Sequence, residues 1–166
     1  MPQDHVYPRP VLEQLPRYAA GKPAPVIEGL TPYKLSSNEN PYGPVPAVHK
    51  VLSEFSDYCR YPDPMATALR ERLSLHLEVP AEDIVTGAGS LGALTQIINT
   101  FAGSNSDGSQ DEVIYAWRSF EAYPIVVRTA GAKDIQVPLT ADHRHDLDAM
   151  AAAINERTRV IILFTP

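Results

Sequence analysis

Cysteine is nearly absent from the sequence. Cys59 is the only one among 166 residues, so no disulfide can form within the chain. Small secreted domains often depend on disulfides, whereas cytosolic proteins keep their thiols reduced. We therefore expect a reducing compartment, the cytoplasm. The first fifteen residues carry charged side chains and no apolar run, so no signal peptide is expected either.

Long apolar runs and an excess of positive charge are missing as well. The aliphatic and aromatic run Val160 to Phe164, like the other apolar runs of the sequence, is far shorter than the ~20 residues of a membrane-spanning helix. The 14 basic side chains are outnumbered by 20 acidic ones, which gives a net charge of −6. Sequence-independent binding of nucleic acid needs Lys and Arg to neutralise phosphates. Neither a membrane nor a nucleic acid is therefore expected as a partner.

Proline is plentiful at one end of the chain and scarce at the other. Twelve of the sixteen prolines precede residue 65. Proline cannot donate to a helix or a sheet ladder, so residues 1–46 are predicted to form an extended arm with short turns. Within this arm, Tyr33 to Ser36 could form a short strand.

After the arm, apolar side chains recur at helical spacing or gather in short runs. Helices are predicted at Val45–Phe55, Met65–Leu77, Ser90–Ala102, Phe120–Thr129 and, capped by Asp146, up to about Asn155. Strands are predicted at Ile84–Thr86, Val113–Trp117, Ile135–Leu139 and Val160–Phe164. This alternation indicates an α/β fold, a three-layer α/β/α arrangement with a mainly parallel sheet, whose ligands bind at the carboxyl ends of the strands.

A glycine-rich turn carries the clearest chemical signal. It runs from Gly87 to Gly92 between a predicted strand and a predicted helix. The first N–H groups of such a helix lack partners and carry a partial positive charge, so a phosphate can bind there. The alternative is a tight turn without a ligand, because a lone glycine pattern is a weak signal.

The kind of phosphate ligand can be narrowed from the surrounding residues. A dinucleotide site needs an acidic residue at the end of the second strand, and that strand ends in Arg118. The chain also lacks the G-x-x-x-x-G-K-[ST] pattern of a P-loop. A ligand with one phosphate and a planar ring fits better, with Phe120 as a stacking platform. The alternative is that Trp117, Phe120 and Tyr123 are ordinary core aromatics.

Several segments together resemble the histidinol-phosphate aminotransferase family, whose members use pyridoxal 5′-phosphate (PLP) and have the aspartate aminotransferase fold. The resemblance rests on the Asn-Glu-Asn-Pro segment at 38–41, Arg-Tyr-Pro-Asp at 60–63, and the glycine turn at 87–90. The stretch from Tyr115 to Pro124 is similar to the aromatic (phenylalanine) aminotransferase branch. The resemblance implies that residues 1–46 are an arm and small-domain segment. Residues 47–166 would then be the first part of a PLP-binding large domain.

The resemblance also implies roles for single residues. Gly89, Ser90 and Leu91 would bind the PLP phosphate, and Phe120 would stack on the ring. Tyr61 would reach the phosphate bound by the partner subunit of a homodimer. The residues implied at the substrate are Tyr18, Asn38, Asn40 and Tyr123. Where many family members have two acidic residues, this chain has Leu91 and Gly92, again as in the aromatic branch.

The lysine that forms a Schiff base with PLP is not identifiable in these residues. The chain has four lysines, none in the family's Ser-x-x-Lys pattern: Lys22, Lys34, Lys50 and Lys133. We expect the catalytic lysine beyond Pro166. The 166 residues would be the N-terminal portion of an aminotransferase, inactive alone.

The expected reaction is amino-group transfer between an aromatic L-amino acid and a 2-oxo acid. Histidinol phosphate is the alternative substrate. Two alternatives of other classes stay open, a nucleotide-binding α/β protein and a non-catalytic fragment. His143 and His145 lie in a predicted turn with no further ligand nearby, so no metal is expected.

Overall fold

The computed structural model describes residues 8–18, 22–35 and 39–164. The described residues up to Tyr18 and from Val85 onward form one compact unit, and those from 22 to Ile84 form a second. The predicted division between residues 1–46 and 47–166 concerns the complete fold and stays a prediction.

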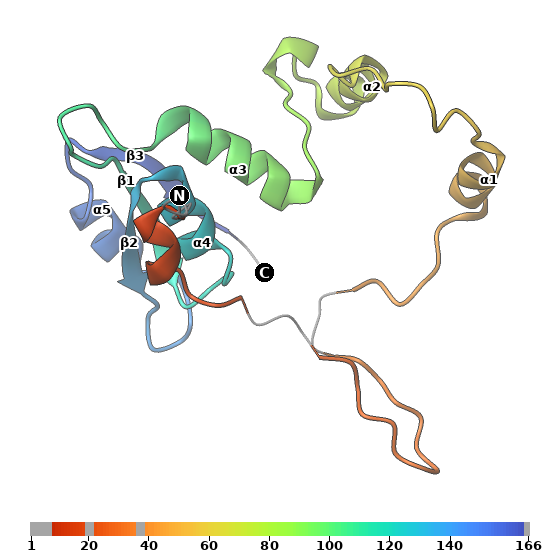
Figure 1. Ribbon diagram of the computed structural model, residues 1–166, viewed down its shortest axis with the longest axis horizontal. Helices are drawn as coiled ribbons and strands as arrows, with labels where there is room; N and C mark the ends of the chain where they lie inside the picture. The colour runs from red at the N-terminus through yellow and green to blue at the C-terminus, as the bar shows by residue number, and fades with distance from the viewer. Residues whose placement is uncertain (1–7, 19–21, 36–38, 165–166) are drawn as a thin grey trace, which may run out of the picture. The chain divides into compact units, whose positions relative to one another are not determined.

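The first unit is built on a three-stranded parallel sheet (Figure 1). The strands are β1 (Glu112–Trp117), β2 (Lys133–Pro138) and β3 (Thr158–Ile162), in the spatial order β2-β1-β3. In register, Ile114 of β1 lies beside Ile135 of β2 and Ile161 of β3. β1 is central and almost wholly buried, as its continuous apolar sequence predicts.

Helices cover both faces of this sheet, which confirms the predicted three-layer arrangement. On one face, α3 (Gly89–Phe101) and α4 (Tyr123–Ala130) pack against Val113 and Tyr115. On the other face, α5 (Leu147–Ala152) places Met150 against Ile114. Asp146 caps α5 as predicted, because its carboxylate accepts a hydrogen bond from the Ala149 amide at 2.9 Å.

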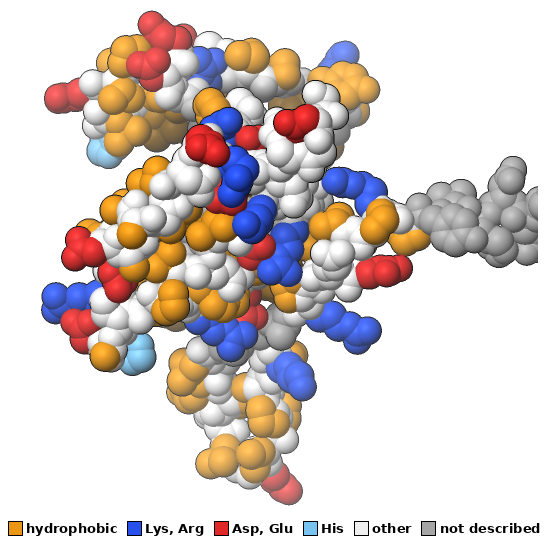
Figure 2. Space-filling model, turned by 90° about the vertical axis from the view of Figure 1, so that its left-hand side faces the viewer, with side chains coloured by type: hydrophobic (Ala, Val, Ile, Leu, Met, Phe, Trp, Pro, Cys, Tyr) orange, Lys and Arg blue, Asp and Glu red, His pale blue; other side chains and the backbone are white. Residues whose placement is uncertain are grey.

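The second unit contains α1 (Pro46–Glu54), α2 (Thr67–Leu77) and the short 3-10 helix η2 (Ala81–Asp83). α1 and α2 confirm the two helices predicted there. Neither helix contains a buried residue, and large apolar side chains of α1 such as Val51 and Leu52 are exposed. Figure 2 shows hydrophobic side chains at the surface among charged ones on the face that it displays.

Two predicted strands are wrong within the described residues. Ile84 to Thr86 is not a strand, and neither is the described part of Tyr33 to Ser36, since residue 36 lies outside the described ranges. A strand needs a hydrogen-bonding neighbour, and neither segment has one in the described chain.

Helix α4 starts three residues later than predicted, at Tyr123. A helix starting at Phe120 would need an N–H from residue 124 for the Phe120 carbonyl, and residue 124 is proline. None of the helices in the described ranges has the length and apolar character that crossing a bilayer requires.

Candidate functional site

The glycine turn is shaped by close backbone packing. A Cβ atom on Gly87 would lie 2.7 Å from the Ala93 nitrogen, so only glycine lets the turn pass so near the start of α3. Gly89 has a φ of +67°, in the left-handed region that glycine adopts without strain. The two glycines therefore have different roles, close approach and backbone direction.

The amino end of α3 has no side-chain cap. Its N-cap residue, Ala88, offers no oxygen to the first-turn amides. The first four N–H groups of a helix have no partner inside it, so the amides of Ser90 and Leu91 depend on an outside acceptor. Both residues are exposed, and within the described ranges no protein group accepts from either amide. This helix end can receive an anion.

A cavity of about 200 Å³ opens beside this helix end. Its lining is Ser90, Leu91, Leu94, Phe120, Tyr123 and Ile162. Residues 90, 91 and 94 share one face of α3 because helix positions three and four apart are neighbours. The other residues follow β1, begin α4 and end β3. The structure thus brings four of the predicted site residues together, Ser90, Leu91, Phe120 and Tyr123.

The aromatic side of the cavity has two different rings. Phe120 is 42% exposed and contacts Tyr123 edge-on, with centroids 5.5 Å apart and planes at 89°. Its faces are therefore not stacked on Tyr123. Tyr123 is buried, and burial raises the pKa of its phenol, which stays neutral at physiological pH.

This donor set fits a phosphate joined to a planar ring. The helix end supplies amides, Ser90 adds a hydroxyl, and Phe120 supplies an aromatic face. The contribution of Tyr123 is a neutral phenol on the same wall.

Leu94 and Ile162 were missed as lining residues. Their apolar character predicts only burial, although the i, i+4 spacing from Ser90 could have indicated Leu94.

The other predicted residues do not line this cavity. Tyr18 is exposed in the first unit. Asn40, in the second unit, accepts a hydrogen bond from the Tyr42 amide at 3.0 Å, so its local role is to form a turn. Asn38 lies outside the described residues. Tyr61 is fully exposed in the second unit, at a cavity of about 500 Å³ that Phe55, Tyr58 and Arg60 also line.

Three of the four lysines are engaged in ion pairs with acidic side chains. Lys34 pairs with Glu39 at 3.0 Å, and Lys50 with Glu54 at 3.9 Å. Lys133 lies 3.2 Å from Glu112 at the amino end of the sheet. None of these three lines the cavity beside α3. Lys133, the one of the three that belongs to the same unit as the cavity, therefore lacks the position that a lysine bonded to the cofactor would need.

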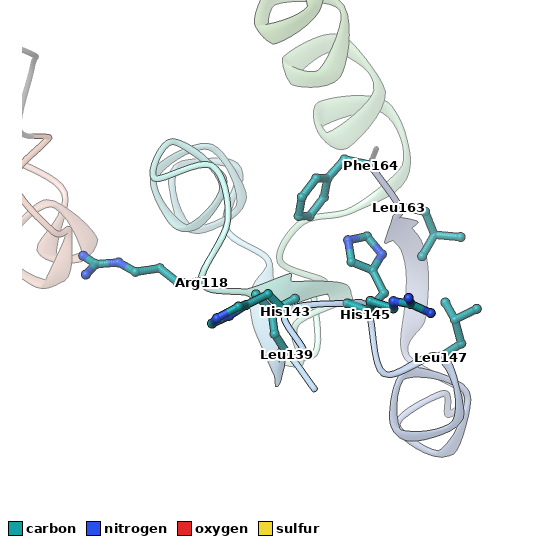
Figure 3. A pocket seen from close by; sticks show the side chains of 8 residues that line it. Arg118, Leu139, His143, His145, Leu147, Leu163 and Phe164 are labelled. Carbon is teal, nitrogen blue, oxygen red and sulfur yellow. The ribbon is translucent and has the colours of Figure 1, made fainter. Parts of the chain in front are cut away.

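A larger cavity, of about 560 Å³, lies at the carboxyl ends of the strands (Figure 3). His145 packs edge-on against Phe164 there, with ring centroids 4.4 Å apart, and its Nε2 atom is buried with no hydrogen-bond partner in the described part of the chain. Arg118 extends away from this pair and binds Glu121 at 3.0 Å. Within the described ranges, no three His, Cys, Asp or Glu side chains are grouped as a metal site.

Comparison with known proteins agrees with the cavity's chemistry. The family model "Aminotransferase class I and II" matches residues 31–166. The aromatic amino acid aminotransferase of Streptomyces coelicolor is 49% identical over 159 residues, which are 95% of this chain and 43% of that relative. The one from Thermobifida fusca is 42% identical over 161 residues, or 96% of this chain and 43% of that protein. The chain thus spans less than half the length of these relatives.

Solved structures give the same result. Histidinol-phosphate aminotransferase from Sinorhizobium meliloti, solved with pyridoxal-5′-phosphate, matches with a TM-score of 0.64 and 26% identity, over 73% of this chain and 32% of that one. An Escherichia coli protein with a methionine aminotransferase function matches with a TM-score of 0.54 and 26% identity, over 69% of this chain and 30% of that one. Because the family model covers most of the sequence, this chain belongs to the class I and II aminotransferase family.

Proposed function

We propose that the whole protein is a PLP-dependent aminotransferase that transfers an amino group between an aromatic L-amino acid and a 2-oxo acid. The observation that carries this proposal is the cavity in which the uncapped start of α3 meets Phe120 and Tyr123. The names of the Streptomyces and Thermobifida relatives support the aromatic substrate.

Each residue at the cavity has a proposed task. The amides of Ser90 and Leu91 and the Ser90 hydroxyl bind the phosphate of PLP, and Gly89 gives the turn the direction this requires. Phe120 holds the ring by stacking. Bound PLP supplies an aldehyde that accepts the amino group and a pyridine ring that withdraws electrons. Tyr123 offers a neutral hydroxyl on the same wall.

The remaining parts of the proposal concern the whole protein. Because the chain spans 43% of its relatives, we assign the lysine that bonds to PLP to residues outside these 166. A homodimer is proposed in which Tyr61 contributes to the partner's phosphate site, and Tyr18, Asn38 and Asn40 to the substrate site. The proposed location is the cytoplasm, where the free and exposed Cys59 would stay reduced.

Binding of the phosphate can be tested directly with a pair of ligands. We would titrate the full-length protein with PLP and with pyridoxal, which lacks the phosphate, and follow absorbance. Hydrogen bonds to a charged group contribute about 1.5–3 kcal/mol each, so two such bonds should make pyridoxal bind about 100-fold more weakly, or worse. Equal affinities would show that no phosphate site exists at the helix end.

Histidinol phosphate is the second candidate substrate, because the Sinorhizobium structure carries that activity in its name. Initial rates with phenylalanine, tyrosine and histidinol phosphate as amino donors separate the two. We expect the highest kcat/KM for an aromatic amino acid. A higher value for histidinol phosphate would replace the aromatic assignment, and no turnover with any of the three would refute the proposed reaction.

A further inference from the structure

The N-terminal segment of the first unit is attached to α4 by two arginine contacts. The segment contains η1 (Pro10–Gln14), which lies against α4 (Figure 1). Arg128 of α4 donates from Nη1 to the Gln14 carbonyl at 3.1 Å. Arg9 donates from Nη1 to the carbonyl of Thr129 at 2.9 Å. Residues more than 110 positions apart in the sequence are joined in this way.

Arg128 is oriented for this contact by a carboxylate of β2. Its Nε lies 2.8 Å from Oδ1 of Asp134, and its Nη2 lies 3.1 Å from Oδ2. A guanidinium bound by two parallel hydrogen bonds has a fixed plane and direction. The Nη1 atom of Arg128 is not used by Asp134 and donates to the Gln14 carbonyl of the N-terminal segment. Asp134 therefore determines where Arg128 can meet Gln14.

Asp134 is itself held firmly. Its side chain is 9% exposed and accepts hydrogen bonds from the Tyr115 hydroxyl at 3.0 Å and from Gln136 Nε2 at 2.8 Å. Burial raises the pKa of this carboxyl, but the bonds from Arg128 and Tyr115 outweigh burial and hold it below its usual value. The carboxylate is thus ionised and immobile at neutral pH.

The same group of residues reaches the cavity beside α3. The Tyr115 ring is fully buried and packs edge-on against Tyr123, with centroids 5.5 Å apart. Tyr123 lines the cavity next to Phe120. The residues that hold the N-terminal segment are therefore connected by direct contacts to Tyr123 in the cavity wall.

We propose that Arg128, oriented by Asp134, is a positioning residue that fixes the N-terminal segment on α4 and thereby sets where Tyr18 stands. Tyr18 follows Gln14 by four residues, so the attachment limits the positions it can reach. The consequence for substrate binding rests on the proposed function. The attachment itself does not.

Hydrogen exchange in the full-length protein tests the attachment. Arg128→Gln should speed exchange of the Leu12 amide, which donates to the Arg9 carbonyl at 3.0 Å, by about tenfold. Exchange in β1 should rise much less, although losing the guanidinium beside buried Asp134 weakens the sheet as well. The control, Arg159→Gln, removes an arginine of the same unit that pairs with Asp111 at 3.3 Å, and should leave Leu12 unaffected.

Unchanged exchange at Leu12 in Arg128→Gln, or an equal rise in β1, would overturn the proposal. If Arg128→Gln does not fold, Arg128→Lys replaces it, since a single ammonium keeps the charge beside Asp134 but not the fork. The same faster exchange at Leu12 is expected in that variant.

Kinetics test the consequence for the substrate. Arg128→Gln should raise KM for the amino acid by about threefold to tenfold while PLP affinity stays at the wild-type value. A purely structural role would lower PLP affinity as well, and that result, or an unchanged KM, would refute the role in substrate positioning. If the wild-type protein neither binds PLP nor transaminates, the proposed function fails, and the exchange data still decide the attachment.

Discussion

Gly87 and Gly89 shape the turn before α3 in two different ways. The glycine pattern and the following serine predict a phosphate turn, which stays a prediction. The structure shows that Gly87 permits a close approach of the backbone to α3 and that Gly89 has a positive φ. Phe120 was predicted to reach the same place and does, because it follows a strand whose carboxyl end opens near α3. The role of Asn40 could not be predicted from its residue type. An asparagine side chain can form a turn or bind a ligand, and here it accepts a hydrogen bond within a turn.

Substituting Gly87 should damage the turn. In Gly87→Ala the new Cβ would meet backbone atoms of α3 at 2.7 Å, and backbone cannot move aside as a flexible side chain can. We expect a loss of about 1–3 kcal/mol in the free energy of unfolding, together with weaker PLP binding. Urea unfolding and PLP titration of the full-length protein measure the two effects.

Gly43→Ala is the matched control, because a Cβ there meets nothing within 4 Å. Its stability and PLP affinity should equal those of the wild type. Wild-type behaviour in Gly87→Ala would mean that the close approach of the turn to α3 is not required.

The strands of the first unit are joined at their amino ends by one buried carboxylate. Glu112 opens β1 and is 2% exposed. Its oxygens accept hydrogen bonds from Asn155 at 2.8 Å, from Lys133 at 3.2 Å and from Arg157 at 3.1 Å. Lys133 opens β2, and Arg157 directly precedes β3. This network links all three strands without taking part in the cavity.

Neutralising Glu112 should destabilise the sheet. Glu112→Gln keeps the shape but loses the charge that faces two cations, and we expect a cost of about 1–3 kcal/mol because the cations themselves are half exposed. Urea unfolding at neutral pH measures it. Glu54→Gln, which breaks the exposed pair with Lys50, is the control and should change stability by less than about 0.5 kcal/mol.

The loss of stability in Glu112→Gln should depend on pH in a defined direction. The hydrogen bond from Asn155, opposed by burial but aided by Lys133 and Arg157, holds the pKa of Glu112 below its ordinary value of 4.5. Its contribution is therefore complete above pH 4.5 and is lost as the pH falls through the lowered pKa. The stability difference between wild type and Glu112→Gln should shrink over that acidic range. A constant difference would contradict the role assigned to the charge.

Elements were predictable where local pattern alone decides them. The apolar spacing located α1, α2 and α3 within two residues at each end, and the capping residue located α5. The strand at Ile84–Thr86 was wrong because pairing is not a local property. The Asp134 and Glu112 networks were missed for a related reason. Their partners lie in other elements, such as Arg128 of α4 for Asp134 and Lys133 of β2 for Glu112. The packing that brings these elements together is not a property of any single segment.

At the scale of the whole molecule, the residues with proposed roles come from both units. Ser90, Phe120 and Tyr123 belong to the first, and Asn40 and Tyr61 to the second. The sequence predicted the family from motifs in both units, and the comparisons confirmed it. The roles given to Tyr61, Tyr18 and the asparagines stay predictions, because they concern a partner subunit and a substrate.

The role of Tyr61 can be tested in the full-length protein. Tyr61→Phe removes only the hydroxyl that is proposed to bind the partner's phosphate site, so PLP affinity should fall about tenfold while the protein stays dimeric. Light scattering and PLP titration measure the two properties. Tyr58→Phe, at the same cavity, is the control and should bind PLP normally. Normal affinity in Tyr61→Phe would remove this residue from the proposed site.

The central claim is that the amino end of α3 and Phe120 together hold PLP. A crystal structure of the full-length protein with PLP tests it most directly. We predict a phosphate oxygen within about 2.7–3.2 Å of the Ser90 or Leu91 amide nitrogen, and the ring stacked on Phe120. PLP bound elsewhere, with this helix end left to water or engaged by protein groups, would contradict the claim.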